Sequence, residues 1–272
     1  MKLPAGKGAP LSAQGLTAAL QAAGLRENDA ALLWTIVEVE TSGVTQGFGF
    51  RQDRLPQVLF ERHKFSEFTN GTFDGAAPDL SGPRGKPYGS VSSQITRLEG
   101  ALDLCEKAGW GPEPAYRATS WGLGQVMGFN YSSVGYASAA AMVDDMLASE
   151  DKQLLAMGRF LAKVGLSKPL RAHRWADFAA GYNGPAYSDY KYDVQLERQY
   201  ERISSGSTPD LRIRAAQAAL MLLGYPPGKI DGVLGDRTRR ALRAFATDNG
   251  RPPTTILDEE TEQLLKRQAG FD

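Results

Sequence analysis

A short polar segment near the end of the chain limits what the rest of it can fold into. Residues 204–208 read Ser-Ser-Gly-Ser-Thr and precede Pro209, a composition typical of linkers between domains. The segment leaves residues 1–203, which can bury a sizeable core, and residues 209–272, which can bury only a small one. We therefore predict a large N-terminal domain, a linker at 204–208 and a small C-terminal domain.

Charge and cysteine content exclude several classes of function. The 272 residues contain 31 Lys plus Arg and 31 Asp plus Glu, so the formal net charge is zero and a nucleic-acid partner is disfavoured. With two histidines and one cysteine, the chain lacks the ligands of a zinc hydrolase, and we expect no metal and no cofactor. Cys105 lies in an apolar run, which predicts a buried side chain.

Hydrophobic segments give no sign of a membrane protein. No continuous apolar run follows Met1, so we expect no secretory signal. No window approaches the roughly 18 apolar residues of a membrane span. We expect synthesis in a host cytoplasm, no membrane insertion and a monomer.

Hydrophobic spacing predicts a mainly helical N-terminal domain. Asn28 and Asp29 are suited to cap a strong helix that runs to about Thr41, and Gly43 is well placed to end it. Residues 57–65 favour a strand, and residues 70–89 favour a long irregular loop. Further helices are predicted over residues 11–23, 94–108, 137–147, 152–164, 175–180 and 195–203.

Two carboxylates near the end of the strong helix face different ways. Leu33, Ile36 and Val37 fall at helical spacings from Glu40, so Glu40 continues the apolar stripe. Glu38 points to nearly the opposite side, where we expect solvent or the flank of the helix.

Apolar surroundings would raise the pKa of the Glu40 carboxyl by disfavouring its charged form. The negative end of the helix dipole acts in the same direction. A protonated carboxyl beside the leaving oxygen is what cleavage of a glycosidic bond requires. The spacing alone also fits a solvated Glu40 at a frayed helix end.

A second acidic candidate follows in the predicted strand. Glu61 and His63 would project to one face, opposite Val58 and Phe60. Glu61 could orient a water molecule or stabilise positive charge on a sugar. The alternative is a surface cluster of Glu61, Arg62 and His63.

Three segments resemble a known superfamily. The runs from Glu40 to Gly43, from Ser120 to Met127 and from Ala179 to Gly184 resemble motifs of goose-type lysozymes and soluble lytic transglycosylases, in the same order. The match is closer to the muramidase domain of phage endolysins, and it covers most of residues 25–203. The resemblance implies a lysozyme-like α+β domain with a small β-hairpin.

The resemblance also implies roles for individual residues. The catalytic glutamate of the family corresponds to Glu40, and Glu61 falls where a second acidic role is expected. The residues expected to bind substrate are His63, Ser120, Gln125, Tyr182 and Asn183. Gln, Asn, Ser and Tyr can hydrogen-bond to the hydroxyls and N-acetyl groups of a polysaccharide.

The C-terminal segment carries the most specific motif. Residues 230–242 resemble the signature of the three-helix peptidoglycan-binding domain, with Asp231 and Gly232 in a tight turn and Asp236 as the expected N-cap. We predict an all-α domain whose wall contacts include Asp231, Thr238 and Arg239. Asp231 and Thr238 could instead only stabilise the turn and the cap.

Together these features predict an endolysin-like glycosidase that cleaves the β-1,4 bond between N-acetylmuramic acid and N-acetylglucosamine in bacterial peptidoglycan. The wall is reached after release from the host cytoplasm. One alternative is a lytic transglycosylase, which leaves an anhydro product. Another is a non-catalytic wall-binding protein, and a substrate such as chitin fits the C-terminal motif poorly.

Overall fold

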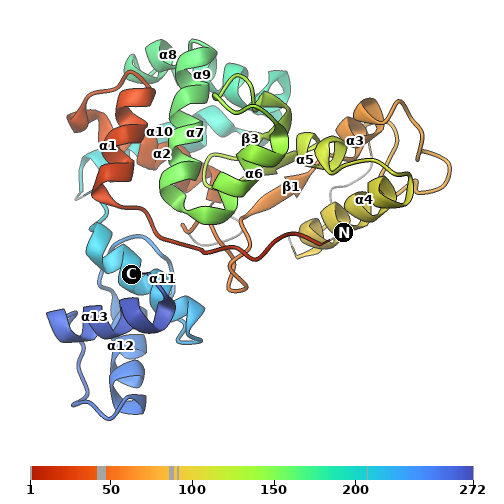
Figure 1. The fold of residues 1–272 in the computed structure, drawn as a ribbon. Helices are drawn as coiled ribbons and strands as arrows, with labels where there is room; N and C mark the ends of the chain where they lie inside the picture. Colours follow the sequence, from red (N-terminus) through yellow and green to blue (C-terminus); the bar gives the residue numbers. More distant parts are fainter. Residues whose placement is uncertain (1, 42–46, 86–88, 91, 207, 272) are drawn as a thin grey trace.

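The chain forms a larger helical part with a small sheet and a smaller part made of helices alone. The computed structural model describes residues 2–41, 47–85, 89–90, 92–206 and 208–271. Figure 1 shows three helices of the C-terminal part grouped below the larger part. The predicted fold class, mainly α with a small β element followed by an all-α unit, is confirmed.

The helices of the larger part follow the predicted order along the chain. Those of α type are α1 (Ala13–Ala22), α2 (Ala30–Thr41), α3 (Arg62–Phe68), α4 (Ser93–Lys107), α5 (Glu113–Arg117), α6 (Ala139–Ala148), α7 (Glu150–Lys163), α8 (Ser167–Arg171), α9 (Trp175–Asn183) and α10 (Tyr192–Ser204). Short 3-10 helices are η1 (Glu27–Asp29), η2 (Gly128–Asn130) and η3 (Pro185–Tyr190). No helix in the described part of the chain is long and apolar enough to cross a bilayer.

Helix α2 lies in the core and sets the position of Glu40. Its residues from Leu32 to Val39 are all buried, as expected for a helix that is apolar on nearly every side. It packs against α1 and α10. Asp29, predicted to cap this helix, is instead the last residue of η1, where its carboxylate accepts from the backbone N–H of Arg26. Gly43, predicted to end the helix, lies outside the described residues.

The sheet has three short strands, and the first is shorter than the sequence suggested. Strands β1 (Val58–Phe60), β2 (Thr119–Trp121) and β3 (Val126–Met127) pair antiparallel in that order, with Leu59 opposite Ser120. The predicted strand over residues 57–65 was wrong beyond Phe60, because the chain turns into α3 after Glu61. From there the apolar residues Phe65 and Phe68 follow helical spacing, and Phe65 donates its N–H to the carbonyl of Glu61.

Cys105, predicted to be buried, is buried and is a free thiol. Three tryptophans, Trp34, Trp121 and Trp175, are buried as well. Trp121 has 1% of its surface exposed, and its indole N–H donates to the carbonyl of Tyr116, so it packs in the core.

The C-terminal part packs a small core between α11 (Leu211–Leu222), α12 (Asp236–Asp248) and α13 (Glu259–Ala269). Gly235, not Asp236, is the residue that precedes α12, so the predicted N-cap lies one position too late. Gly232 adopts a φ of +73°, and a Cβ there would lie 2.6 Å from the backbone nitrogen of Asp210. The turn therefore requires glycine for both conformation and space. The apolar core side chains include Ala219, Leu220, Leu242, Phe245 and Leu265.

The two parts are joined by a buried ion pair as well as by the linker. Arg214 of α11 and Glu150 of α7 have 1% and 0% of their side-chain surfaces exposed. Arg214 also donates to the carbonyl of Gly47 at 2.6 Å, and a Cβ at Gly47 would lie 2.6 Å from the carbonyl of Ile230. A small apolar cluster that includes Phe48, Phe50, Ala218 and Ile230 lies at the same boundary. The parts therefore dock against each other.

Candidate functional site

Glu40 lies at the end of α2, beside the end of α9. Its carboxyl group is half-buried, and its Oε1 accepts a hydrogen bond from the Asn183 side-chain amide at 3.1 Å. Asn183 is the last residue of α9. Two segments separated by 143 positions in the chain therefore meet at this carboxyl, as the resemblance implied.

Burial raises the pKa of Glu40 from its ordinary value of 4.5 to about 7, while the hydrogen bond from Asn183 acts in the opposite direction. The effect of burial is the larger because one neutral amide replaces only part of the lost hydration of a carboxylate. At neutral pH this carboxyl can therefore both give and take a proton.

Tyr182 is fixed next to Glu40. Its hydroxyl donates to the carbonyl of Gly124, and its ring stacks on Phe178 and meets Phe160 edge-on. Burial, together with the charge of Glu40, holds the pKa of Tyr182 well above its usual value. The phenol is thus neutral, and its rigid position allows it to form one wall of the site.

A chain of side-chain amides connects the sheet to the end of α2. The Ser120 hydroxyl donates to the Gln125 side-chain oxygen at 2.9 Å, and the Gln125 amide donates to the carbonyl of Gly122 at 2.8 Å and to that of Gln57 at 3.4 Å. The Gln57 amide in turn lies 3.5 Å from the backbone carbonyl of Glu40. Ser120 and Gln125 are thus linked to the Glu40 helix through Gln57.

Gln125 adopts a backbone conformation that is unusual for a side-chain-bearing residue. Its φ is +45°, in the turn between β2 and β3. Such a conformation persists only when neighbouring contacts hold it, and it is found more often at functional sites than elsewhere. The hydrogen bonds of its side chain supply that support.

Glu61 and His63 form a second group at the start of α3. The Glu61 carboxylate lies 3.1 Å from His63 Nδ1, and His63 Nε2 lies 2.9 Å from the Arg84 guanidinium. Burial, then the positive charge of Arg84, lowers the pKa of His63 below its usual value. Glu61 follows Gln57 by four positions. At roughly 3.3 Å per extended residue, their Cα atoms are at most about 13 Å apart, so this second group lies near the side chains around Gln57.

Of the two surroundings expected for Glu38, solvent or the flank of the helix, the structure excludes solvent. Only 6% of its surface is exposed, and its carboxylate pairs with Arg202 at 3.0 Å and with Lys229 of the C-terminal part. The helical spacing placed Glu38 correctly on the side opposite the apolar stripe. That side is covered by α10 and by the segment that carries Lys229.

The wall-contact candidates of the C-terminal part all have internal partners. Asp231 accepts from the backbone N–H of Val233 at 3.0 Å, and Thr238, buried, donates to the carbonyl of Pro227 at 3.1 Å. Arg239 donates to the carbonyl of Thr255 at 3.1 Å. These contacts stabilise the turn and its neighbours, and wall contact by the three residues stays a prediction.

Two members of the site were not predicted from the sequence. Gln57 contributes through its side-chain amide and lies outside the three motifs. Gly124 lies within the run from Ser120 to Met127, but it contributes through its backbone carbonyl, which residue type does not predict. Among the residues that the structure describes, no group of three or more His, Cys, Asp or Glu side chains is arranged to hold a metal ion.

Comparisons with known proteins agree on two segments of the chain. The N-acetylmuramidase family profile matches residues 29–204, and a peptidoglycan binding domain profile matches residues 210–265. A crystal structure of Burkholderia AP3 phage endolysin is similar, with 32% sequence identity and a TM-score of 0.59, over 72% of this chain and 71% of that chain. A search of curated proteins returned no match.

Proposed function

Since the chain belongs to the N-acetylmuramidase family, we propose that it hydrolyses the β-1,4 bond between N-acetylmuramic acid and N-acetylglucosamine, with Glu40 as the general acid. Its muramidase and peptidoglycan-binding domains, and its similarity to a phage endolysin, make it a peptidoglycan-cleaving glycoside hydrolase of the endolysin type. The choice of bond and the roles of single residues are the parts that we propose.

The half-buried Glu40 carboxyl, whose pKa burial raises to about 7, is the observation that carries this assignment. A glycosidic oxygen is a poor leaving group unless it is protonated as the bond breaks. A carboxylic acid with a pKa near the working pH is protonated in about half of the molecules and still transfers its proton readily.

Glu40 would give its proton to the leaving oxygen while positive charge develops on the sugar. The Asn183 amide, which contacts Glu40 at 3.1 Å, holds the carboxyl in one orientation and stabilises the carboxylate that remains. Tyr182, Ser120 and Gln125 would line the glycan. Glu61, paired with His63, would position water or stabilise the oxocarbenium-like state.

The C-terminal domain would hold the enzyme on its polymer. Its family profile supports peptidoglycan as the partner. A tether of this kind raises the effective concentration of substrate at the catalytic site. We further propose that the protein acts as a monomer, inserts into no membrane, binds no nucleic acid, and reaches the wall after synthesis in a host cytoplasm.

Product analysis of digested peptidoglycan tests the assignment. The wild type should release fragments ending in intact N-acetylmuramic acid, and Glu40→Gln should lower the rate by about 10²–10⁴-fold, the usual contribution of a general acid. Glu27→Gln, a change of the same kind at the exposed residue before α2, should keep the wild-type rate. Glu61→Gln should fall between the two.

Three outcomes would overturn parts of the proposal. A folded Glu40→Gln variant with the wild-type rate would remove Glu40 from the chemistry. Fragments lighter by one water would identify an anhydro product and replace hydrolysis by the transglycosylase reaction. If the wild type does not lower the turbidity of permeabilised bacteria, the protein only binds the wall.

A further inference from the structure

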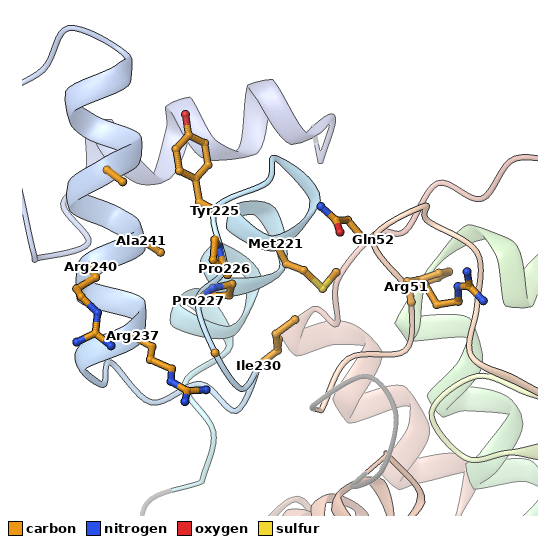
Figure 2. Close-up of a pocket in the computed structure, with 13 residues that line it drawn as sticks. Arg51, Gln52, Met221, Tyr225, Pro226, Pro227, Ile230, Arg237, Arg240 and Ala241 are labelled. Carbon is orange, nitrogen blue, oxygen red and sulfur yellow. The ribbon is translucent and has the colours of Figure 1, made fainter. Parts of the chain in front are cut away.

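A cavity of about 700 Å³ lies between the two domains, away from the Glu40 site. The muramidase domain contributes Phe50, Arg51 and Gln52, and the other walls come from the C-terminal domain. Figure 2 shows Gln52 on one side, Arg237 and Arg240 on the other, and Met221 and Ile230 between them. Neither domain alone encloses this space.

One face of α12 supplies the charged wall of the cavity. Arg237, Arg240, Ala241 and Ala244 fall at spacings of three and four residues and therefore share a face of the helix. The two alanines leave space, while the two arginines extend past them. The face is thus shallow at its centre and cationic at its edge.

The floor of the cavity is apolar. Met221 and Ile230 line it, and Ile230 is buried in the same cluster as Phe50. The segment Pro226–Pro227–Gly228 closes one end. Gly228 has a φ of +86°, and a Cβ there would lie 3.0 Å from the side chain of Arg237, so glycine leaves room for the arginine.

Arg237 and Arg240 are exposed and, within the described residues, form no ion pair or hydrogen bond. Other arginines nearby are engaged: Arg239 binds the carbonyl of Thr255, and Arg251 pairs with Glu260. Two unpaired guanidinium groups facing one opening favour an anionic ligand, and guanidinium binds carboxylates with two parallel hydrogen bonds.

We propose that this interdomain cavity binds the peptide stems of peptidoglycan through their free carboxylates, with the apolar floor taking alanine methyl groups. The inference rests on the proposed function, because it takes peptidoglycan as the polymer. The glycan strand offers neutral hydroxyls and N-acetyl groups, whereas the stems carry the negative charge that the two arginines complement.

The docked arrangement of the domains gives the cavity its second wall. Arg214 and Glu150 form the buried pair at the boundary, and Lys229 pairs with Glu38 beside it. A stem seated here contacts residues 50–52 as well as α12. Stem binding would therefore fix where the polymer enters the muramidase domain, in addition to tethering the protein.

Calorimetric titration of the full chain with a synthetic stem tetrapeptide, L-Ala–γ-D-Glu–meso-diaminopimelate–D-Ala, tests this proposal. Replacing both arginines, Arg237→Ala with Arg240→Ala, should weaken binding by about tenfold or more. Arg243→Ala removes an exposed arginine of the same helix that does not line the cavity, and it should leave the affinity unchanged. Gln52→Ala should weaken binding by a smaller factor.

Two further titrations identify what is recognised. A stem with amidated carboxylates should bind the wild type as weakly as the free stem binds the double variant. A chitin tetrasaccharide should bind the wild type and the double variant equally. Equal stem affinities of the double variant and Arg243→Ala, or undiminished binding of the amidated stem, would overturn the proposal.

Failure here is distinguishable from failure of the proposed function. If the double variant digests wall at the wild-type maximal rate but needs more wall to reach half of it, both proposals stand. If the wild type binds stems but releases no glycan fragments, the enzymatic assignment fails and the cavity keeps its ligand. If glycan fragments appear but stems do not bind, the enzymatic assignment stands and only the proposed ligand of the cavity is wrong.

Discussion

Two carboxyl groups of the muramidase domain, the buried Glu150 and the half-buried Glu40, have opposite surroundings. Glu150, at the first position of α7, accepts from the backbone N–H groups of Leu11 and Gly49 at 2.8 Å each and from both terminal nitrogens of Arg214. Glu40, at the end of α2, has the Asn183 amide as its hydrogen-bond donor. The hydrogen bonds and the cation around Glu150 replace the water that it has lost. Among the described residues, much less replaces the water lost by Glu40.

This difference distinguishes a carboxylate that stabilises the fold from a carboxyl group that can transfer a proton. A buried carboxylate is stable when a cation and several N–H donors replace the water it has lost. A carboxyl without them keeps its proton to higher pH, and burial raises the pKa of Glu40 to about 7. Glu150, the compensated carboxylate, joins the two domains. Glu40, the uncompensated one, lies where two motifs of the glycosidase meet.

Breaking the compensated pair should have the largest effect. Arg214→Ala leaves Glu150 buried without its cation, which should lower the free energy of unfolding by about 3–5 kcal/mol. Arg212→Ala is the matched control, because Arg212 lies on the same helix but has 63% of its side chain exposed. Its loss should cost about 1 kcal/mol or less. Urea unfolding of the three proteins measures both changes.

A second variant sharpens that test. Glu150→Met combined with Arg214→Met removes both charges, so it should recover much of the stability that Arg214→Ala loses. If Arg214→Ala is no more destabilising than Arg212→Ala, the buried pair does not hold the domains together and the comparison fails.

Removing the uncompensated charge should stabilise the protein above neutral pH. Glu40 has a folded-state pKa of about 7 against an ordinary value of 4.5, so the folded state keeps its proton longer and loses stability as pH rises between these values. Glu40→Gln lacks this loss. Its advantage over the wild type should be absent at pH 4 and reach at most about 3 kcal/mol at pH 8. Unfolding midpoints at the two pH values measure it.

The same measurement has a clear negative outcome. A constant difference between Glu40→Gln and the wild type from pH 4 to pH 8 would show that Glu40 ionises as easily in the folded state as in the unfolded one.

The smallest expected change comes from Asn183, which donates a hydrogen bond to Glu40. The Asn183 hydrogen bond favours the carboxylate, so Asn183→Ala should raise the pKa of Glu40 further, by up to about one unit. The alkaline limit of activity should move to higher pH even as the rate falls. Tyr182→Phe is the control: its hydroxyl binds Gly124, so its loss should leave the alkaline limit in place. A shift to lower pH in Asn183→Ala would contradict this role.

Local patterns were sufficient to predict the helix that carries Glu40. The apolar stripe ending in Glu40 was visible in the spacing of Leu33, Ile36 and Val37, and the helix forms at the expected place. The resemblance to a known family supplied Tyr182 and Asn183. The structure brings both to Glu40, although no local rule predicts contact across 143 positions.

Features that depend on contacts between domains could not be predicted from local spacing. The ion pairs of Glu38 were not predicted because its partners, Arg202 and Lys229, lie 164 and 191 positions away. The pair of Glu150 and Arg214 belongs to no motif for the same reason. The strand expected to reach Phe65 stops at Phe60, because the alternating pattern that began it gives way to helical spacing.

A carbon-13 NMR titration of the Glu40 carboxyl, assigned by its absence in Glu40→Gln, tests the central claim most directly. The claim predicts a midpoint at about pH 7, set by burial. A midpoint near the ordinary value of 4.5 would contradict it, because a carboxyl that ionises there holds too little proton near neutral pH to act as the acid.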